Sequence, residues 1–252
     1  MRGLSGVFSD IFYRGKMVFE NQLIRHYHTA EMLLLYDGNF IQFKRVPTLA
    51  ELVESVQYLR DFHQQNGQEH VKLLFPENEK IPDELWQYLK NTGFNIGSQE
   101  FYYILPSDFA KVDKNQTITV DKVTDQNLCQ FLKLAYEIDS EISLDFARQK
   151  RDIHVQNFGS QKFMQLMAYY DGNPAGMVDA IIGHETVEID GLVILPSYRR
   201  RGVASQLQQF IMEEFADKRI ILVADGEDSV KEMYKNQNYR YGGFKFEALK
   251  VY

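Results

Sequence analysis

The sequence contains one cysteine, one tryptophan and six prolines among its 252 residues. Because Cys129 has no second cysteine to pair with, a disulfide framework within the chain is excluded. No apolar run approaches the ~20 residues that a helix needs to cross a bilayer, so no membrane span is expected. The N-terminal segment carries one charge, and Ser9 and Asp10 interrupt any apolar stretch, which is not typical of a signal peptide. These absences predict a soluble, cytoplasmic protein.

The chain also has no excess of basic residues. It carries 28 Lys and Arg against 35 Asp and Glu, a net charge of −7, which argues against a basic nucleic-acid module. Apolar residues make up 44% of the chain, enough for a folded core in one large or two small domains. His26 and His28 with Glu31 could ligate a metal, but two histidines without further clustered ligands are more typical of surface residues. No metal is therefore expected.

A polar segment at residues 106–116 marks the clearest boundary. The segment follows a strand-like stretch, and the alternating residues 117–120 after it are typical of a new, half-buried strand. The sequence therefore predicts one domain over residues 1–110 and a second over residues 117–252.

The expected elements of the first domain run strand, strand, helix, strand, helix, strand. A hairpin is expected at Asp37-Gly38, between strands at 33–36 and 39–43. Thr48 and Glu51 have the spacing of a capping box, which predicts the start of a helix. A second helix is expected from Pro82 to Gly93.

The second domain repeats this order after a strand and two helices. Its expected helices cover 124–139, 143–158, 203–215 and 229–236, its strands cover 117–123, 164–170, 177–182, 187–194, 220–223 and 244–251, and Asp171-Gly172 forms a hairpin turn. Strands and helices mixed in this order predict an α/β or α+β fold. The segment Leu89–Phe94 also echoes Tyr234–Tyr239 before the last strand of each domain, which favours a tandem repeat.

One basic stretch indicates chemistry. The strand at 187–194 runs into Pro196, and then Arg199, Arg200 and Arg201 precede Gly202 at the start of a helix. Free N–H groups at a helix start attract anions, glycine permits close approach, and arginine suits phosphate. The alternative is an exposed basic loop with a glycine for its turn. The flanking strand and apolar helix favour the anion site.

This stretch resembles motif A of the GNAT superfamily of acyl-CoA-dependent N-acetyltransferases, Q/R-x-x-G-x-G/A, here Arg199-x-x-Gly202-x-Ala204. The resemblance covers about residues 117–252 and implies a mixed, mostly antiparallel central sheet flanked by helices, with two such domains in tandem. It implies acetyl-CoA as co-substrate. The implied coenzyme-binding residues are Leu192, Val193, Ile194, Arg199, Arg200, Arg201, Gly202, Val203, Ala204 and Ser205. The resemblance also suggests a strand bulge, which Gly191 could accommodate.

Two side chains are candidates for proton transfer. Tyr234 matches a family tyrosine that often protonates the departing thiolate, although Asn238, Tyr239 and Glu227 depart from the family pattern. Glu188 lies where some members keep a catalytic glutamate. Its alternatives as base are Asp190, on the same strand face, and water.

The resemblance implies an N-acetyltransferase that transfers acetyl directly to an amine. The alternatives are a non-catalytic acyl-CoA-binding or regulatory module, and an anion loop for another phosphorylated ligand. The expected partner is a small-molecule or peptide amine, without nucleic acid or membrane, and whether the chain forms a homodimer stays open. Pro47 and the absence of a glycine before the Thr48 helix predict no coenzyme site in the first domain. Cys129 is expected to be buried in a helix.

Overall fold

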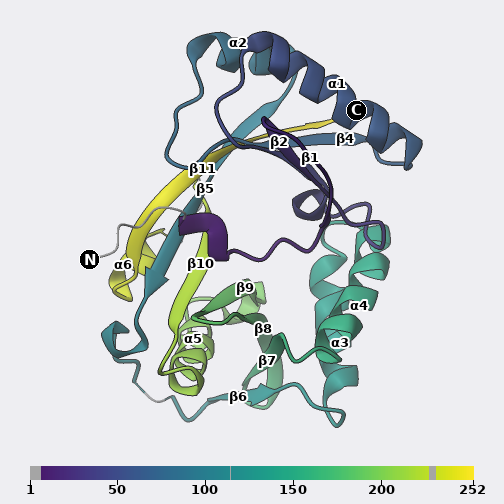
Figure 1. Ribbon diagram of the computed structural model, residues 1–252. Helices are drawn as coiled ribbons and strands as arrows, with labels where there is room; N and C mark the ends of the chain where they lie inside the picture. Colours follow the sequence, from purple (N-terminus) through teal and green to yellow (C-terminus); the bar gives the residue numbers. More distant parts are fainter. Residues whose placement is uncertain (1–6, 114, 227–230) are drawn as a thin grey trace. The chain divides into compact units, whose positions relative to one another are not determined.

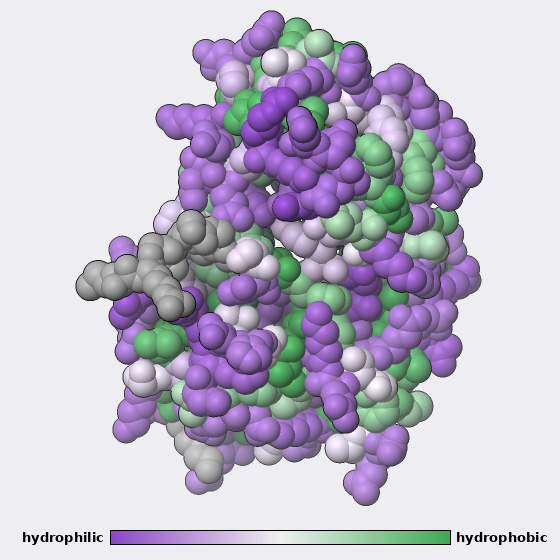
Figure 2. All heavy atoms as spheres, viewed as in Figure 1, coloured by the Kyte–Doolittle hydropathy of each residue, from purple (hydrophilic) through white to green (hydrophobic). Residues whose placement is uncertain are grey.

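The computed structural model describes residues 7–113, 115–226 and 231–252 of the chain. The described residues form two compact units, one of residues 7–101, 224–226 and 242–252, the other of residues 102–223 and 231–241. This division differs from the continuous ranges 1–110 and 117–252, because the last strand of the chain belongs to the first unit. Among the described residues no helix is long and apolar enough to cross a membrane. Hydrophilic residues cover most of the face drawn in Figure 2.

The first unit is a mixed sheet with two helices on one face (Figure 1). Its strand order is β1-β2-β3-β4-β11-β5, and β1–β2, β2–β3 and β4–β11 are antiparallel pairs, whereas β3 and β4 are parallel. Its elements in chain order are β1 (Lys16–Glu20), β2 (Ile24–His28), β3 (Phe40–Phe43), α1 (Leu49–Gln65), β4 (His70–Leu74), α2 (Asp83–Asn91), β5 (Asn95–Ile104) and β11 (Arg240–Val251). Short 3-10 turns lie at Val7–Asp10 and Tyr36–Gly38. The core between helices and sheet includes Leu52, Leu59 and Leu73, all fully buried.

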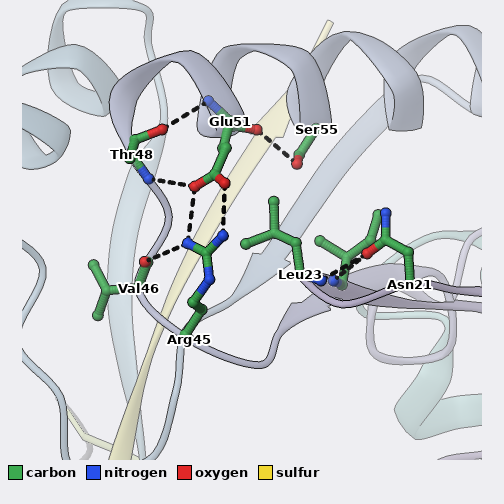
Figure 3. A network of polar contacts seen from close by, with 8 residues as sticks. Asn21, Leu23, Arg45, Val46, Thr48, Glu51 and Ser55 are labelled. Atoms are coloured by element: carbon green, nitrogen blue, oxygen red, sulfur yellow. Dashed lines mark hydrogen bonds and ion pairs between the residues drawn. The ribbon is translucent and has the colours of Figure 1, made fainter.

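The first helix begins at the predicted capping box (Figure 3). The Glu51 N–H donates to the Thr48 hydroxyl over 3.3 Å, and the Thr48 N–H donates to the Glu51 carboxylate over 2.8 Å. Arg45 adds a two-pronged ion pair to the same carboxylate, at 2.9 and 2.6 Å. The Arg45 guanidinium, with the Thr48 N–H, lowers the pKa of Glu51 to about 2. A local sequence pattern therefore determined where this helix starts.

The second unit has helices on both faces of its sheet. The order is β5-β10-β9-β8-β7-β6, where β5 contributes residues 102–104. The pairs β6–β7, β7–β8 and β8–β9 are antiparallel, whereas β9 and β10 are parallel. Its elements in chain order are β6 (Ile118–Lys122), α3 (Leu128–Asp139), α4 (Leu144–Phe158), β7 (Phe163–Tyr170), β8 (Asn173–Ile182), β9 (Thr186–Ile194), α5 (Val203–Glu214), β10 (Arg219–Asp225) and α6 (Lys231–Asn236), with 3-10 turns at Pro106–Asp108 and Pro196–Tyr198. Helix α5 lies on one side of β7–β9, and α3 and α4 lie on the other (Figure 1). The predicted fold class, a mixed and mostly antiparallel sheet flanked by helices, is confirmed.

The two units repeat one pattern. In the first, three antiparallel strands lead through α1 to the parallel strand β4 and then to α2. In the second, β7, β8 and β9 lead in the same way through α5 to the parallel strand β10 and then to α6. The element that follows the pattern is β5 in one case and β11 in the other.

The C-terminal ends of α2 and α6 have the same backbone hydrogen bond. The Phe94 N–H donates to the Leu89 carbonyl over 2.9 Å, as the Tyr239 N–H does to the Tyr234 carbonyl. The residue before each donor has a positive φ, 85° at Gly93 and 68° at Asn238. Asparagine is among the few residues other than glycine that adopt this conformation readily. The echo in the sequence therefore reflects one shared helix-ending motif.

Three local expectations were wrong. Residues 33–36 form no strand, and the partner of β3 is the earlier strand β2. His26 is fully buried and not a surface residue, with its ring 4.5 Å from the Phe62 ring. Cys129 is exposed and not buried, because it faces away from the cluster that α3 forms around Phe131. The hairpin at Asp171-Gly172 is confirmed between β7 and β8.

Candidate functional site

The candidate site lies where the pairing between strands β9 and β10 ends. The parallel register of the two strands ends at the pair Ile189 and Leu222, although β9 continues to Ile194. On the edge of β9 that faces β10, the backbone groups of residues 190–194 therefore lie past the end of the pairing between the two strands. The half-buried residues Leu192, Val193 and Ile194 lie on this stretch. An extended ligand could pair with their backbone as a strand would.

A bulge lies at the same place. Asp179 pairs with Asp190 and Met177 pairs with Val193, so β9 contains one residue more than β8 over this interval. Gly191 has a φ of 59°, and a Cβ built on it would meet nothing within 4 Å. The bulge that the sequence suggested at Gly191 is present, and it turns the local N–H groups out of the regular ladder.

The loop after β9 leads into helix α5, whose N-terminus has no side-chain cap. Gly202 is the N-cap of α5 with a φ of 87°, and no side chain caps the first turn. The first turn holds Val203, which is buried, and Ala204 and Ser205, which are partly exposed. Arg200 also has a positive φ, of 58°. Alternating backbone conformations of this kind turn successive N–H groups toward one point, where an anion can bind.

The flanking arginines are held in different ways. The Arg199 Nε donates to the carbonyl of Ile194 over 3.1 Å, which ties the loop to the end of β9. The Arg201 guanidinium lies over the Tyr170 ring, 5.0 Å from its centroid. Arg200 and Arg201 are exposed, so their charge reaches solvent at the loop. The loop is both positively charged and open to an anion.

The two candidate bases on β9 differ in exposure. Glu188 is only 7% exposed, whereas Asp190 is exposed. Both project from the same face of the strand, the face that α3 and α4 cover. The Glu188 carboxyl is thus removed from bulk water, while Asp190 lies beside the bulge.

Tyr234 lies on α6 and is 9% exposed. Its ring contacts those of Tyr102 and Tyr239, at centroid distances of 5.3 and 5.5 Å. Beside this helix, the Gln237 amide donates to the Ser205 hydroxyl over 3.2 Å. A hydrogen bond therefore joins the segment after α6 to the first turn of α5.

Two departures from the family pattern preserve local structure. Asn238 adopts the positive φ that a glycine would adopt, and Tyr239 fills a buried position while its hydroxyl donates to Gln208. The third departure, Glu227, lies outside the described residues.

The equivalent N-terminus in the first unit, that of α1, is occupied by a side chain of the protein itself. There the Glu51 carboxylate accepts a hydrogen bond from the Thr48 N–H, and the Arg45 guanidinium forms an ion pair with the same carboxylate (Figure 3). The start of α1 is thus capped by side chains of the chain itself, whereas the start of α5 has no side-chain cap.

Two family models match separate parts of the chain. The acetyltransferase (GNAT) family model matches residues 127–239. Over these residues the second unit is similar to a GNAT domain. A domain of unknown function, DUF5613, matches residues 7–102. No curated protein matches the chain.

Solved structures agree with the fold. A functionally unknown conserved protein from Staphylococcus epidermidis shares 28% identity with a TM-score of 0.87, covering 97% of each chain. A GCN5-related N-acetyltransferase from Kribbella flavida shares 15% identity with a TM-score of 0.59, covering 97% of this chain and 91% of that one. A tandem GNAT protein from the clavulanic acid biosynthesis pathway shares 8% identity with a TM-score of 0.54, covering 84% and 75%. The GNAT family and fold support acyl transfer as the general activity.

Sequence reasoning missed a row of polar residues on the face of the second unit's sheet that α4 covers. Asp179 on β8 pairs with Asp190 on β9 and with Gln165 on β7. The signal was a single aspartate inside the apolar run of β8, which local periodicity does not explain. Among the described residues no group of three or more His, Cys, Asp or Glu is arranged to hold a metal.

Proposed function

We propose that the protein is an N-acetyltransferase that moves an acetyl group from acetyl-CoA to an amine by direct attack. The observation that carries this proposal is the N-terminus of α5, which has no side-chain cap, together with the bulged end of β9 that extends beyond its pairing with β10. Bound acetyl-CoA would supply the thioester. The fit is supported by the open space beside Gly191 and by the positive φ of Gly202.

The chain's own groups would divide the binding between them. The backbone of residues 199–205 would hold the pyrophosphate at the helix N-terminus, with Arg199, Arg200 and Arg201 adding positive charge. The backbone of residues 192–194 would pair with the pantetheine arm. An N–H group at the bulge would donate to the thioester carbonyl oxygen and stabilise the charge that develops there.

Two side chains would move protons. Glu188 would accept the proton of the attacking amine, directly or through water, with Asp190 as the alternative base. Tyr234 would donate its phenolic proton to the thiolate that leaves. No covalent enzyme intermediate is needed, because the amine itself is the nucleophile.

The remaining proposals concern the setting of the reaction. The first unit would bind no coenzyme, since Glu51 occupies the start of its α1 helix. The acceptor would be a small-molecule or peptide amine in the cytoplasm, and neither nucleic acid, membrane nor metal would take part. A homodimer remains open to measurement.

Calorimetric titration of acetyl-CoA tests the proposal. Micromolar affinity corresponds to about −8 kcal/mol and is easily measured. Gly202→Glu places a carboxylate at the proposed pyrophosphate site, and Gly202→Ala is the matched control because it imposes the same backbone strain without charge. We expect the wild type and Gly202→Ala to bind and Gly202→Glu to lose binding by at least tenfold. Equal binding by the two variants would contradict the site, and no binding by the wild type would contradict the function.

A further inference from the structure

A cavity of about 290 Å³ lies in the first unit, beside the C-terminal end of α1. Its lining includes Arg60 from α1, Gln68, Glu69 and His70 at the start of β4, and Tyr252, the residue after β11. Small-molecule pockets range from about 300 to 1,000 Å³, so this cavity suits a ligand at the small end of that range.

Two oppositely charged side chains of this lining have no charged partner. Among the described residues, neither the Arg60 guanidinium nor the Glu69 carboxylate has an ion pair within 4 Å or a side-chain hydrogen bond. The two groups are therefore more than 4 Å from each other, although they line one cavity. A ligand that carries one negative and one positive group would complement both charges.

The Arg60 guanidinium is held against an aromatic ring. It lies over the Tyr252 ring, 4.0 Å from the ring centroid. The Tyr252 N–H in turn donates to the backbone carbonyl of Glu69 over 2.8 Å, which ties Tyr252 to the wall of the cavity. A guanidinium stacked on a ring keeps its in-plane N–H donors free, and these donors match the two oxygens of a carboxylate. Arg60 is thus suited to the negative group of the ligand.

Gln68 and His70 add hydrogen-bond acceptors to the same lining. The Gln68 Nε2 donates to the carbonyl of Leu33 over 3.0 Å, so the other amide atom is the oxygen. This oxygen is buried without a partner, in a residue that is only 4% exposed. The His70 Nε2 donates to the carbonyl of Asn39 over 3.0 Å, and burial lowers the pKa of His70 to about 4, so its Nδ1 is an acceptor at neutral pH.

A buried acceptor without a partner is costly unless water or a ligand donates to it. The Gln68 oxygen and the Glu69 carboxylate can only accept hydrogen bonds, and an ammonium group has three N–H donors and no acceptor. This part of the lining is therefore suited to the positive group of the ligand.

We propose that the cavity of the first unit binds a free α-amino acid. The carboxylate would pair with Arg60, and the ammonium would donate to the Gln68 oxygen and to the Glu69 carboxylate. An α-amino acid carries both groups on one carbon atom, which suits a small cavity. A nucleotide would place its negative charge against Glu69, and a simple amine would leave Arg60 without a counter-charge. All the lining residues belong to the first unit, so this site is independent of the acetyl transfer proposed for the second.

Thermal unfolding with each of the common L-amino acids at about 10 mM selects the ligand, because a bound ligand raises the melting temperature. Calorimetry without coenzyme then compares that amino acid with its carboxamide, which lacks the negative charge, and with its N-acetyl derivative, which lacks the positive charge. Each is titrated into the wild type, Arg60→Gln and Glu69→Gln. Lys90→Gln and Glu54→Gln are the matched controls, because each removes one charge of the same sign from an exposed residue of the same unit.

We expect at least one amino acid to bind, and its carboxamide and N-acetyl derivative to bind at least tenfold more weakly. Arg60→Gln should erase the preference over the carboxamide, Glu69→Gln should erase the preference over the N-acetyl derivative, and the controls should retain both. Gly202→Glu should bind the amino acid within twofold of the wild type, because the change lies in the second unit. Binding of no amino acid, or preferences that survive both substitutions in the cavity, would overturn the site. Loss of binding in Gly202→Glu would also overturn it, because the amino acid would then bind at the loop before α5.

Discussion

The phenolic hydroxyl of Tyr239 donates a hydrogen bond of 2.8 Å to the side-chain oxygen of Gln208. Tyr239 follows the helix that carries Tyr234, and Gln208 is a fully buried residue of α5. Burial raises the pKa of Tyr239 well above its usual value of 10, so the phenol stays protonated and donating. The hydroxyl that departs from the family pattern thus ties the two helices of the candidate site together.

Tyr239→Phe should lower the free energy of unfolding by about 1–3 kcal/mol, because it leaves the buried Gln208 oxygen without its donor. Urea denaturation followed by circular dichroism measures the change. The double variant Tyr239→Phe with Gln208→Leu should recover part of the loss, since neither polar partner then remains. An unchanged midpoint for the single variant would show that the bond contributes nothing to stability.

Tyr234→Phe should reduce kcat by about 100-fold and leave acetyl-CoA affinity within twofold. Phenylalanine keeps the ring contacts with Tyr102 and Tyr239 but cannot protonate a thiolate. Steady-state thiol release and calorimetry give the two values. Tyr241→Phe is the control, as it removes a hydroxyl from an exposed tyrosine of the same terminal region. Unchanged turnover would remove Tyr234 from the mechanism.

The protein should lose stability as the pH falls below about 6.5. Burial lowers the pKa of His26 and of His70 to about 4, and their neutral forms are the ones that the fold accommodates. Between pH 6.5 and 4 the unfolded chain binds more protons than the folded chain, so stability is full above this window and falls through it, by on the order of 3 kcal/mol for each histidine.

Denaturation at pH 7.5, 6 and 5 checks this dependence. His26→Leu should flatten the pH dependence whatever it does to stability at pH 7.5. His184→Gln changes an exposed histidine and should leave the dependence as in the wild type. A wild-type protein equally stable at pH 7.5 and 5 would contradict the burial of neutral histidines.

Cys129 should react with a thiol reagent in the folded protein at nearly the rate found in denaturant. The side chain is exposed, so no unfolding is needed for access. Absorbance after addition of an aromatic disulfide reagent measures the rate, and Cys129→Ser should abolish the signal. If Cys129 reacted only after denaturation, its side chain would be buried in the folded protein, as the helical pattern predicted.

Much of the local structure could be predicted from neighbouring residues. The capping box at Thr48 and the turn at Asp171-Gly172 depend on contacts between residues at most three apart. The loop that ends at Gly202 also shows a local preference, because its φ of 87° suits glycine. Short-range steric and hydrogen-bonding preferences are sufficient to specify such features, so these features can be predicted from the sequence.

The tertiary structure alone decided the contacts between distant residues. Strand β11 pairs with β4, placing Val251 opposite His70, and no local pattern carries that pairing. The burial of His26, the exposure of Cys129 and the alignment of Asp179 with Asp190 likewise depend on strand register and helix orientation. The sequence by itself determined most of the helices, the strands of the second unit and the position of the glycine-bearing loop before α5. Packing decided which side chains meet, because burial and register arise only when separate segments come together.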